Sequence, residues 1–219
     1  LAAVILVCGT LSTSGIVDMQ GSLGSRNVVA TGVVPFLIFL VSATAELNRP
    51  PFDLVEAEQE LVGGFNTEYS SIRFALFFLA EFMNTITMSA FIVTLFFGGP
   101  QPVTIGNTTL DIPLIPNGLE GTVWLILKVL VFLYIYIWFR GTLPRFRYDQ
   151  LMDLGWKFLI PASLGWFMLL AAQRLADDRG WDQWIVVPVS LMVIIVAFVM
   201  MQLAFRASDR NREAEGVQF

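Results

Sequence analysis

The sequence predicts an all-α fold, a polytopic bundle of about six transmembrane helices in a single transmembrane domain over residues 1–219. Three observations support this prediction. Of the 219 residues, 56% are hydrophobic and only 14% are charged, whereas soluble domains carry about 25% charged residues. The mean hydropathy is +0.69. Several apolar stretches reach the roughly 20 residues that a helix needs to cross the hydrocarbon core of a bilayer.

Six apolar segments follow one another along the chain and are the expected transmembrane helices. They cover residues 1–14, 28–46, 74–97, 120–139, 156–173 and 185–205. The first segment has no basic residues before it and does not start with Met, which is unlike a complete signal peptide. We expect it to be the second half of a helix that begins in a longer chain. Pro35 lies inside the second segment and is expected to kink it.

The basic residues predict which ends of the helices face the cytoplasm, because cytoplasmic loops carry an excess of Lys and Arg. The connections after the second and fourth segments, together with the C-terminal tail, hold nine basic residues if Lys157, just past the second connection, is counted, and the other three connections hold three. We therefore expect residues 47–73 and 140–155 to be cytoplasmic loops, or loops on the matrix side of a mitochondrion.

The composition argues against several kinds of site within this chain. It has one Cys, Cys8, and no His. Iron–sulfur clusters need several Cys, haem is usually held by His, Cys or Met, and zinc needs several Cys, His or carboxylate ligands. We therefore expect no metal site and no redox centre in this chain. The net charge of −5 argues against binding to nucleic acid, which requires basic surfaces.

The acidic residues are concentrated in one polar stretch. Residues 45–82 hold seven of the 18 acids of the chain, which are Glu46, Asp53, Glu56, Glu58, Glu60, Glu68 and Glu81. Pro50 and Pro51 end the second apolar segment, and Asp53 with Glu56 forms a capping box that starts a short connecting helix. A Gly-Gly pair ends that helix. The acids of the connecting helix either form a solvated face or serve a function.

Two charges of opposite sign lie inside apolar segments. Glu81 lies about 10 Å along the third segment at 1.5 Å per residue, and Lys128 lies near the centre of the fourth. A carboxylate at mid-membrane costs about 2.5–3.5 kcal/mol on insertion scales. The two residues either form a structural ion pair or belong to a buried polar path on which carboxylates relay protons. Asn84, Thr85 and Thr87 would extend such a path or form ordinary interhelical hydrogen bonds.

Two further stretches have both a structural and a functional interpretation. Residues 140–157 hold three Arg and one Lys among apolar residues, which suits lipid headgroups, an acidic partner protein or the mouth of a cytoplasmic cavity. Residues 74–82, "FALFFLAEF", are rich in Phe. Aromatic walls with a few polar groups suit a flat apolar ligand, although Phe in membrane helices usually packs against neighbours or faces lipid.

Two motifs resemble one protein family. They are "AELNRPPFDLVEAEQELVGGFNTEYSSIRFALFFLAEFMN" at residues 45–84 and "RGTLPRFRYDQLMDLGWKFLIPASL" at residues 140–164. Both are similar to the membrane subunit of respiratory complex I, the NADH:quinone oxidoreductase, that joins the quinone site to the membrane arm. This subunit is called H in bacteria and has a mitochondrial counterpart. Its members have eight or nine spanning helices, so this chain resembles their C-terminal part.

The resemblance implies a function. Quinone would enter from the bilayer and be reduced at the top of a cavity, and residues 47–73 would form part of the cavity's floor and wall. Nearby acids would couple the reduction to proton movement in antiporter-like subunits. The implied proton-path residues are Glu46, Asp53, Glu56, Glu60, Glu68, Glu81 and Lys128. The implied quinone-cavity residues are Arg49, Glu58, Phe65, Arg73, Phe74, Phe77, Arg140 and Arg145.

The resemblance also implies the substrate, the partners and the location. The chain would be a subunit of a proton-translocating enzyme whose substrate is a quinone, either menaquinone or ubiquinone. FMN and iron–sulfur clusters would be held only by partner subunits. The implied partners are the cluster-bearing and quinone-chamber subunits of the peripheral arm, small and antiporter-like membrane subunits, and membrane lipid. The last segment and the tail extend beyond the shorter mitochondrial pattern, which favours a bacterial plasma membrane over the mitochondrial inner membrane.

Two other functions stand as alternatives. The homologous membrane subunit of a hydrogenase-type ion-pumping complex would have a similar sequence without using quinone. A secondary transporter would place charged helices around a site at the membrane midplane. Such folds usually show inverted repeats and broken helices, and neither pattern is found in this sequence.

Overall fold

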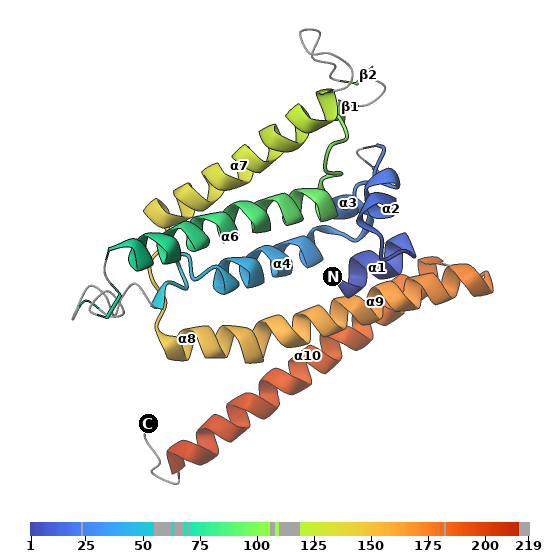
Figure 1. Ribbon diagram of the computed structural model, residues 1–219. Helices are drawn as coiled ribbons and strands as arrows, with labels where there is room; N and C mark the ends of the chain where they lie inside the picture. Colours follow the sequence, from blue (N-terminus) through green and yellow to red (C-terminus); the bar gives the residue numbers. More distant parts are fainter. Residues whose placement is uncertain are drawn as a thin grey trace. The chain divides into compact units, whose positions relative to one another are not determined.

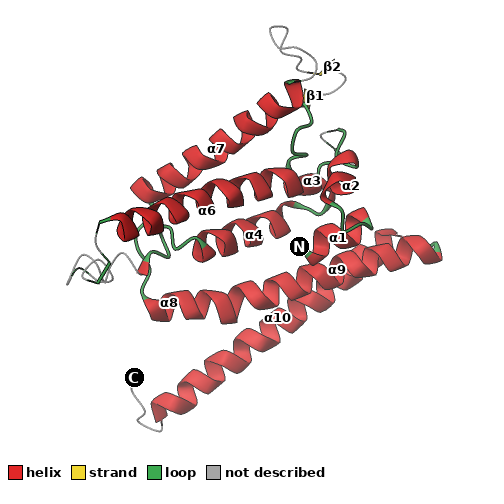
Figure 2. Ribbon diagram, in the orientation of Figure 1, coloured by secondary structure: helices red, strands yellow, loops and turns green. Residues whose placement is uncertain are grey.

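The computed structural model describes residues 1–22, 24–54, 63, 68–69, 71–105, 108–109, 119–181 and 183–214 (Figure 1). Helices make up nearly all of the regular structure in these residues, as Figure 2 shows, so the predicted all-α class is confirmed. The chain forms two compact units, Leu1–Leu151 and Met152–Phe219. Strands β1 (Thr104–Ile105) and β2 (Thr108–Thr109) pair as a small antiparallel hairpin that the sequence did not predict.

Four of the described helices are long and apolar enough to cross a membrane. They are α6 (Ile72–Phe96), α7 (Glu120–Thr142), the continuous helix Tyr148–Arg179 and the stretch Val186–Leu203 of α10 (Gln183–Ala214). The helix Tyr148–Arg179 consists of α8 (Tyr148–Asp153), the π-helical turn η2 (Leu154–Leu159) and α9 (Ile160–Arg179). These four helices correspond to the last four predicted segments.

The first two predicted segments form shorter helices. Residues 1–14 contain α1 (Ala2–Cys8) and the start of α2 (Thr13–Asp18), and residues 28–46 divide into α3 (Asn27–Ala30) and α4 (Val33–Glu46). Gly32, with a φ of 82°, separates α3 from α4, and glycine adopts this conformation without steric cost. Pro35 is the third residue of α4, where helical N–H groups lack partners in any case, so it helps to begin the helix instead of kinking it.

The predicted cytoplasmic loop at residues 140–155 is mostly helical. Helix α7 continues to Thr142, and the next helix begins at Tyr148. Only residues 143–147 therefore lie between the two helices. The polar and charged residues of this stretch do not prevent a helix, because Arg, Lys and Gln have good helix propensity, as do the Leu and Met residues between them.

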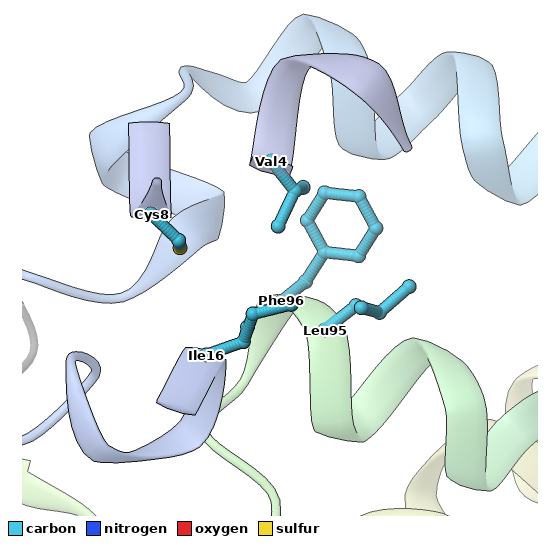
Figure 3. Close-up of a cluster of buried hydrophobic side chains, with 5 residues drawn as sticks. All are labelled: Val4, Cys8, Ile16, Leu95 and Phe96. Atoms are coloured by element: carbon cyan, nitrogen blue, oxygen red, sulfur yellow. The ribbon is translucent and has the colours of Figure 1, made fainter. Parts of the chain in front are cut away.

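The first unit is held together around α6, which packs against α2, α3, α4 and α7. Five buried side chains join α1 and α2 to the end of α6, and Figure 3 shows them converging: Val4, Cys8, Ile16, Leu95 and Phe96. Next to this cluster, the ring of Phe36 in α4 contacts the rings of Phe96 and Phe97 at centroid distances of 5.5 and 5.4 Å. Since lipid is as apolar as these side chains, close packing provides most of their stabilisation in a membrane.

The second unit is built around α9 and α10, which pack along each other. At the π-helical turn, the side chain of Gln202 in α10 donates a hydrogen bond to the carbonyl of Lys157 (Nε2 to O 3.2 Å). A Cβ placed on Gly165 of α9 would lie 2.9 Å from the Cγ2 atom of Ile194. The two helices therefore approach closely at Gly165, as small residues allow in membrane helix pairs.

We expect Gly165→Ala to destabilise the second unit by about 1–3 kcal/mol relative to a matched glycine substitution, the usual cost of forcing atoms into a packed contact. Gly141→Ala is that control, because nothing lies within 4 Å of a Cβ added at Gly141. Both variants replace a helical glycine by alanine, in α9 and in the last turn of α7, and only Gly165→Ala adds the clash. The measurement is the thermal unfolding midpoint of the detergent-solubilised protein. Equal midpoints in the two variants would contradict close packing at Gly165.

Candidate functional site

The candidate site begins where the chain leaves α4 in a buried turn that covers residues 47–54. Backbone hydrogen bonds hold this turn, from Arg49 N to Thr44 O (3.2 Å) and from Phe52 N to Arg49 O (2.9 Å). The side chains of Phe52 and Asp53 are buried, and the whole Asp53 residue is only 1% exposed. A solvated acidic face is therefore the wrong interpretation for Asp53, because this turn directs polar groups into the protein.

The turn places Arg49 between two residues of α6. The Nη2 atom of Arg49 lies 3.3 Å from Oε1 of Glu81, and its guanidinium lies 5.0 Å from the centroid of the Phe82 ring. Arg49 is 8% exposed, whereas the Glu81 side chain is 35% exposed. A buried cation is thus held by a partly exposed carboxylate and by the face of an aromatic ring, which attracts cations.

The same turn supplies an acid to the connection that follows α7. The Oδ2 atom of Asp53 lies 3.7 Å from Nη2 of Arg145, whose side chain is 35% exposed. Next to this pair, the backbone N–H of Phe146 donates to the Pro51 carbonyl at 2.9 Å, and the rings of Phe52 and Phe146 lie 5.7 Å apart. The two connections that were both predicted to be cytoplasmic therefore meet at one end of the first unit.

The structure brings Arg49, Asp53, Glu81 and Arg145 together at this end. Five other predicted site residues are exposed, which are Glu46, Glu68, Arg73, Phe77 and Arg140. Phe74 is half-buried, and its ring stacks on Phe78 with centroids 5.9 Å apart. Glu56, Glu58, Glu60 and Phe65 lie outside the described residues.

Lys128 lies far from this cluster. Its Nζ atom donates hydrogen bonds to the carbonyls of Phe97, Gly99 and Gln101 at 2.9, 2.9 and 2.7 Å. Phe97 follows Glu81 by 16 residues, which corresponds to about 24 Å along α6. The alternative of an ion pair between Glu81 and Lys128 is therefore wrong, since Glu81 contacts Arg49 in the first half of α6 and Lys128 binds carbonyls just beyond its C-terminal end.

Comparison with known proteins decides the family. Residues 1–171 match the sequence model of a family described as NADH dehydrogenase. The chain belongs to the NADH dehydrogenase family. It is also 49% identical over 201 residues to two proteins named as the H subunit of NADH-quinone oxidoreductase, from Frankia alni and Frankia casuarinae, which covers 88% of this chain and 42% of each relative. The resemblance predicted from the two motifs is thus confirmed, and the chain spans less than half the length of these relatives.

This member of the NADH dehydrogenase family is a multi-pass membrane protein, because its family match agrees with its long apolar helices. Three aromatic residues of the site were not predicted individually: Phe52 and Phe146 were missed, and Phe82 was included only as part of the Phe-rich stretch 74–82. The sequence holds a weak signal for two of them, because Phe82 directly follows an intramembrane acid and Phe146 lies between two arginines. Their contacts join residues that are far apart in the chain, which a single sequence does not reveal.

In this NADH dehydrogenase-family chain, we expect Arg145→Met to lower stability by about 2 kcal/mol, the range for a lost hydrogen bond or ion pair to a charged group. The carboxylate of Asp53 is almost fully buried, so water replaces Arg145 poorly, and the solvent exposure of Arg145 keeps the cost from being larger. Arg147→Met is the matched control, because it removes the same charge from an exposed position of the same connection.

The measurement for this pair of variants is the thermal midpoint of the solubilised protein, together with the rate at which a protease cuts residues 143–147. Arg145→Met is expected to lower the midpoint and to speed cleavage, whereas Arg147→Met changes neither. A midpoint for Arg145→Met equal to that of Arg147→Met would show that the contact with Asp53 does not stabilise this end of the unit.

Proposed function

We propose that this chain is the part of an H-type membrane subunit that lines the quinone cavity of a proton-pumping NADH:quinone oxidoreductase and begins the acidic path that couples quinone reduction to proton translocation. The names of its relatives support the enzyme class. The observation that supports the site best is the contact of Arg49 with both Glu81 and Phe82. A guanidinium in this position can bind a ligand oxygen and influence an acid at the same time.

A row of aromatic rings on α6 leads to this guanidinium. Phe74 stacks on Phe78, Phe78 meets Phe82 edge to face with centroids 4.7 Å apart, and Arg49 lies over Phe82. The three rings recur every four residues and therefore lie on one face of the helix. A quinone head group is flat and apolar and carries two carbonyl oxygens. The rings suit its faces, and Arg49 suits a carbonyl oxygen as a charged hydrogen-bond donor.

Reduction of the quinone provides a reason for Glu81 to exchange a proton. A quinone that accepts two electrons and two protons becomes a quinol, and the reduced form is negatively charged before both protons arrive. This charge attracts Arg49 and weakens its contact with Glu81, which lies 3.3 Å away. Glu81 then takes up a proton, and it releases the proton when Arg49 returns. The electrons come from partner subunits, which hold the FMN and the iron–sulfur clusters.

The exposed acids at the end of the unit connect Glu81 to the cytoplasm in this proposal. Glu46 ends α4 and Glu68 precedes α6, and both are exposed. Glu56 and Glu60 belong to the same path by the resemblance, while Asp53 holds the connection after α7 in place. The proposed partners are the peripheral-arm subunits that hold the clusters and the small and antiporter-like membrane subunits. The proposed location is a bacterial plasma membrane.

The test is to purify the tagged chain from its own membranes in mild detergent and to assay what comes with it. We expect a large assembly that oxidises NADH when quinone is added and that stops when a quinone-site inhibitor is added. An assembly that consumes or evolves hydrogen and ignores these inhibitors would instead identify the hydrogenase-type relative. A chain that purifies without partners and takes up a solute into vesicles would identify a transporter.

A further inference from the structure

The C-terminal end of α6 is bonded by buried polar side chains from the turn after α2 and from α3. Helix ends leave carbonyl groups without helical partners. Here the carbonyls of residues 94 and 95 each accept a hydrogen bond from Nε2 of Gln20 at 3.2 Å, and the carbonyl of Leu95 also accepts one from Nδ2 of Asn27 at 2.8 Å. Gln20 and Asn27 are 0% and 1% exposed. This end of the helix, which we call the outer end because it is opposite to residues 47–54, is therefore firmly held.

Beyond the helix, three carbonyl oxygens converge on one ammonium group. They belong to Phe97, Gly99 and Gln101, and they lie 2.9, 2.9 and 2.7 Å from Nζ of Lys128. Gly98 and Gly99 have φ values of 75° and 51°, left-handed conformations that residues with a Cβ rarely adopt. These two glycines allow the tight turn that brings alternate carbonyls to one point. The turn forms a cradle of oxygen atoms around a cation.

Lys128 reaches this cradle from well inside α7. The helix starts at Glu120, so the Cα atom of Lys128 lies about 12 Å from that end at 1.5 Å per residue. Helical side chains lean toward the N-terminus of their helix, and a long lysine chain extends its charge toward the polar end of a span. The charge that the sequence places at mid-membrane is therefore held at the outer end, where Lys128 is 9% exposed.

A second cation binds the same connection. The Nη2 atom of Arg26 donates to the Pro102 carbonyl at 3.0 Å, and Arg26 is 5% exposed. Burial lowers the pKa of the Arg26 guanidinium, but arginine stays protonated in proteins. Both Arg26 and Lys128 thus bind carbonyls of the connection that follows the C-terminal end of α6, where the helix macrodipole is negative. Backbone dipoles stabilise both charges at this end.

The three bonds use every N–H group of the Lys128 ammonium, which has three donors and no acceptor. A neutral amine has only two N–H groups, so release of a proton would break one of the three bonds. The remaining two would weaken as well, because hydrogen bonds from a charged donor are stronger than those from a neutral one. The geometry therefore opposes proton exchange at Lys128.

We propose that Lys128 has a structural role. The three carbonyls form a site for a primary ammonium group, the Lys128 ammonium occupies this site permanently, and its bonds fix the connection between α6 and α7. This positioning role replaces the proton-path role that the resemblance implies for Lys128. The proton carriers of the chain are then the acids at the opposite end of the first unit. The proposal itself concerns the stability of the chain, and only its tests in the assembled complex and by proton translocation rest on the proposed function.

The test is chemical rescue of Lys128→Ala in the assembled, detergent-purified complex. This change removes three carbons and the ammonium, which are the atoms of n-propylammonium. The measurement is the fraction of the chain that stays assembled after heating, followed by size-exclusion chromatography. We expect the midpoint to fall by at least about 5 °C, since loss of a few kcal/mol shifts a chain of this size by that amount. Added n-propylammonium restores most of this loss and does not change the wild type.

Two controls separate the site from general effects. The neutral 1-propanol is expected to restore nothing, and Leu127→Ala, which changes an exposed neighbour in α7, is expected to keep the wild-type midpoint. If Lys128→Ala does not assemble, n-propylammonium added during expression and solubilisation must recover the assembly. A wild-type midpoint for Lys128→Ala, equal effects of the amine and the alcohol, or no recovery of an unassembled variant would each overturn the proposal.

Lys128→Arg distinguishes a fixed cation from a proton carrier. Arginine keeps the charge and the donors but does not release a proton. We expect the assembled variant to translocate protons at close to the wild-type ratio of protons to electrons, measured in vesicles without added amine. An assembled Lys128→Arg complex that transfers electrons but no longer pumps would return Lys128 to the proton path. If arginine does not fit the cradle, the rescue of Lys128→Ala still tests whether a bound ammonium fixes the connection.

Discussion

Under the proposed function, Arg49→Met is expected to lower NADH:quinone oxidoreductase activity by about 10- to 100-fold, because a bond from a charged donor contributes about 1.5–3 kcal/mol and 1.36 kcal/mol is a factor of ten in rate. Methionine keeps most of the apolar length of arginine, so the change removes the guanidinium from between Glu81 and Phe82 and leaves the packing largely intact. The measurement is the quinone dependence of the rate in membranes with equal amounts of assembled complex.

The quinone dependence shows how Arg49 acts. If the guanidinium binds the quinone oxygen mainly in the reacting state, kcat and kcat/KM fall together, whereas a rise in KM alone means that it binds substrate and transition state equally. Arg49→Lys keeps the charge but loses the planar, forked arrangement of donors, so an intermediate rate is expected. A wild-type rate and KM for Arg49→Met in a fully assembled complex would remove Arg49 from the quinone site.

The sequence predicts the helices of this fold well where their cause is local. Helices α6 and α7 are long runs of apolar residues, and such a run has few alternatives in a membrane, where every backbone polar group needs an internal partner. The prediction of helix boundaries is weaker where a helix ends but the residues on both sides of its end are apolar. Gly32 lies within one apolar run, yet it separates α3 from α4. Hydropathy does not report such a break, because the break depends on backbone conformation and not on how apolar the residues are.

The candidate site is predicted in part, for a similar physical reason. A charge inside an apolar segment is visible in the sequence, so Glu81 and Lys128 are both found. Their partners are not visible, because Arg49 lies 32 positions before Glu81 and only the packing of α4 against α6 brings the two together. The direction of a long side chain is also a tertiary property. For this reason the mid-membrane position expected for the Lys128 charge is wrong, although the position of its Cα in α7 is right.

Glu81→Gln is expected to abolish most of the proton translocation while leaving the complex assembled. Glutamine has the shape of glutamate and its side-chain oxygen still accepts a hydrogen bond from Arg49, but it does not take up and release a proton. Electron transfer is also expected to fall, since a coupled enzyme does not run freely when the proton step is blocked. The measurement is the ratio of protons to electrons in vesicles. Asp149→Asn is the control, because it neutralises an exposed acid outside the proposed path.

The double variant Arg49→Met with Glu81→Gln tests whether the two residues act as one unit. Residues that share one interaction show non-additive effects, and the double-mutant cycle measures the coupling energy between them. If the role of Arg49 is to hold and release Glu81, the double variant loses little more activity than the worse single variant. If Arg49 binds quinone and Glu81 carries protons independently, the two losses multiply. Full proton translocation in Glu81→Gln would contradict both versions, and the path would then have to begin at Glu46 or Glu68.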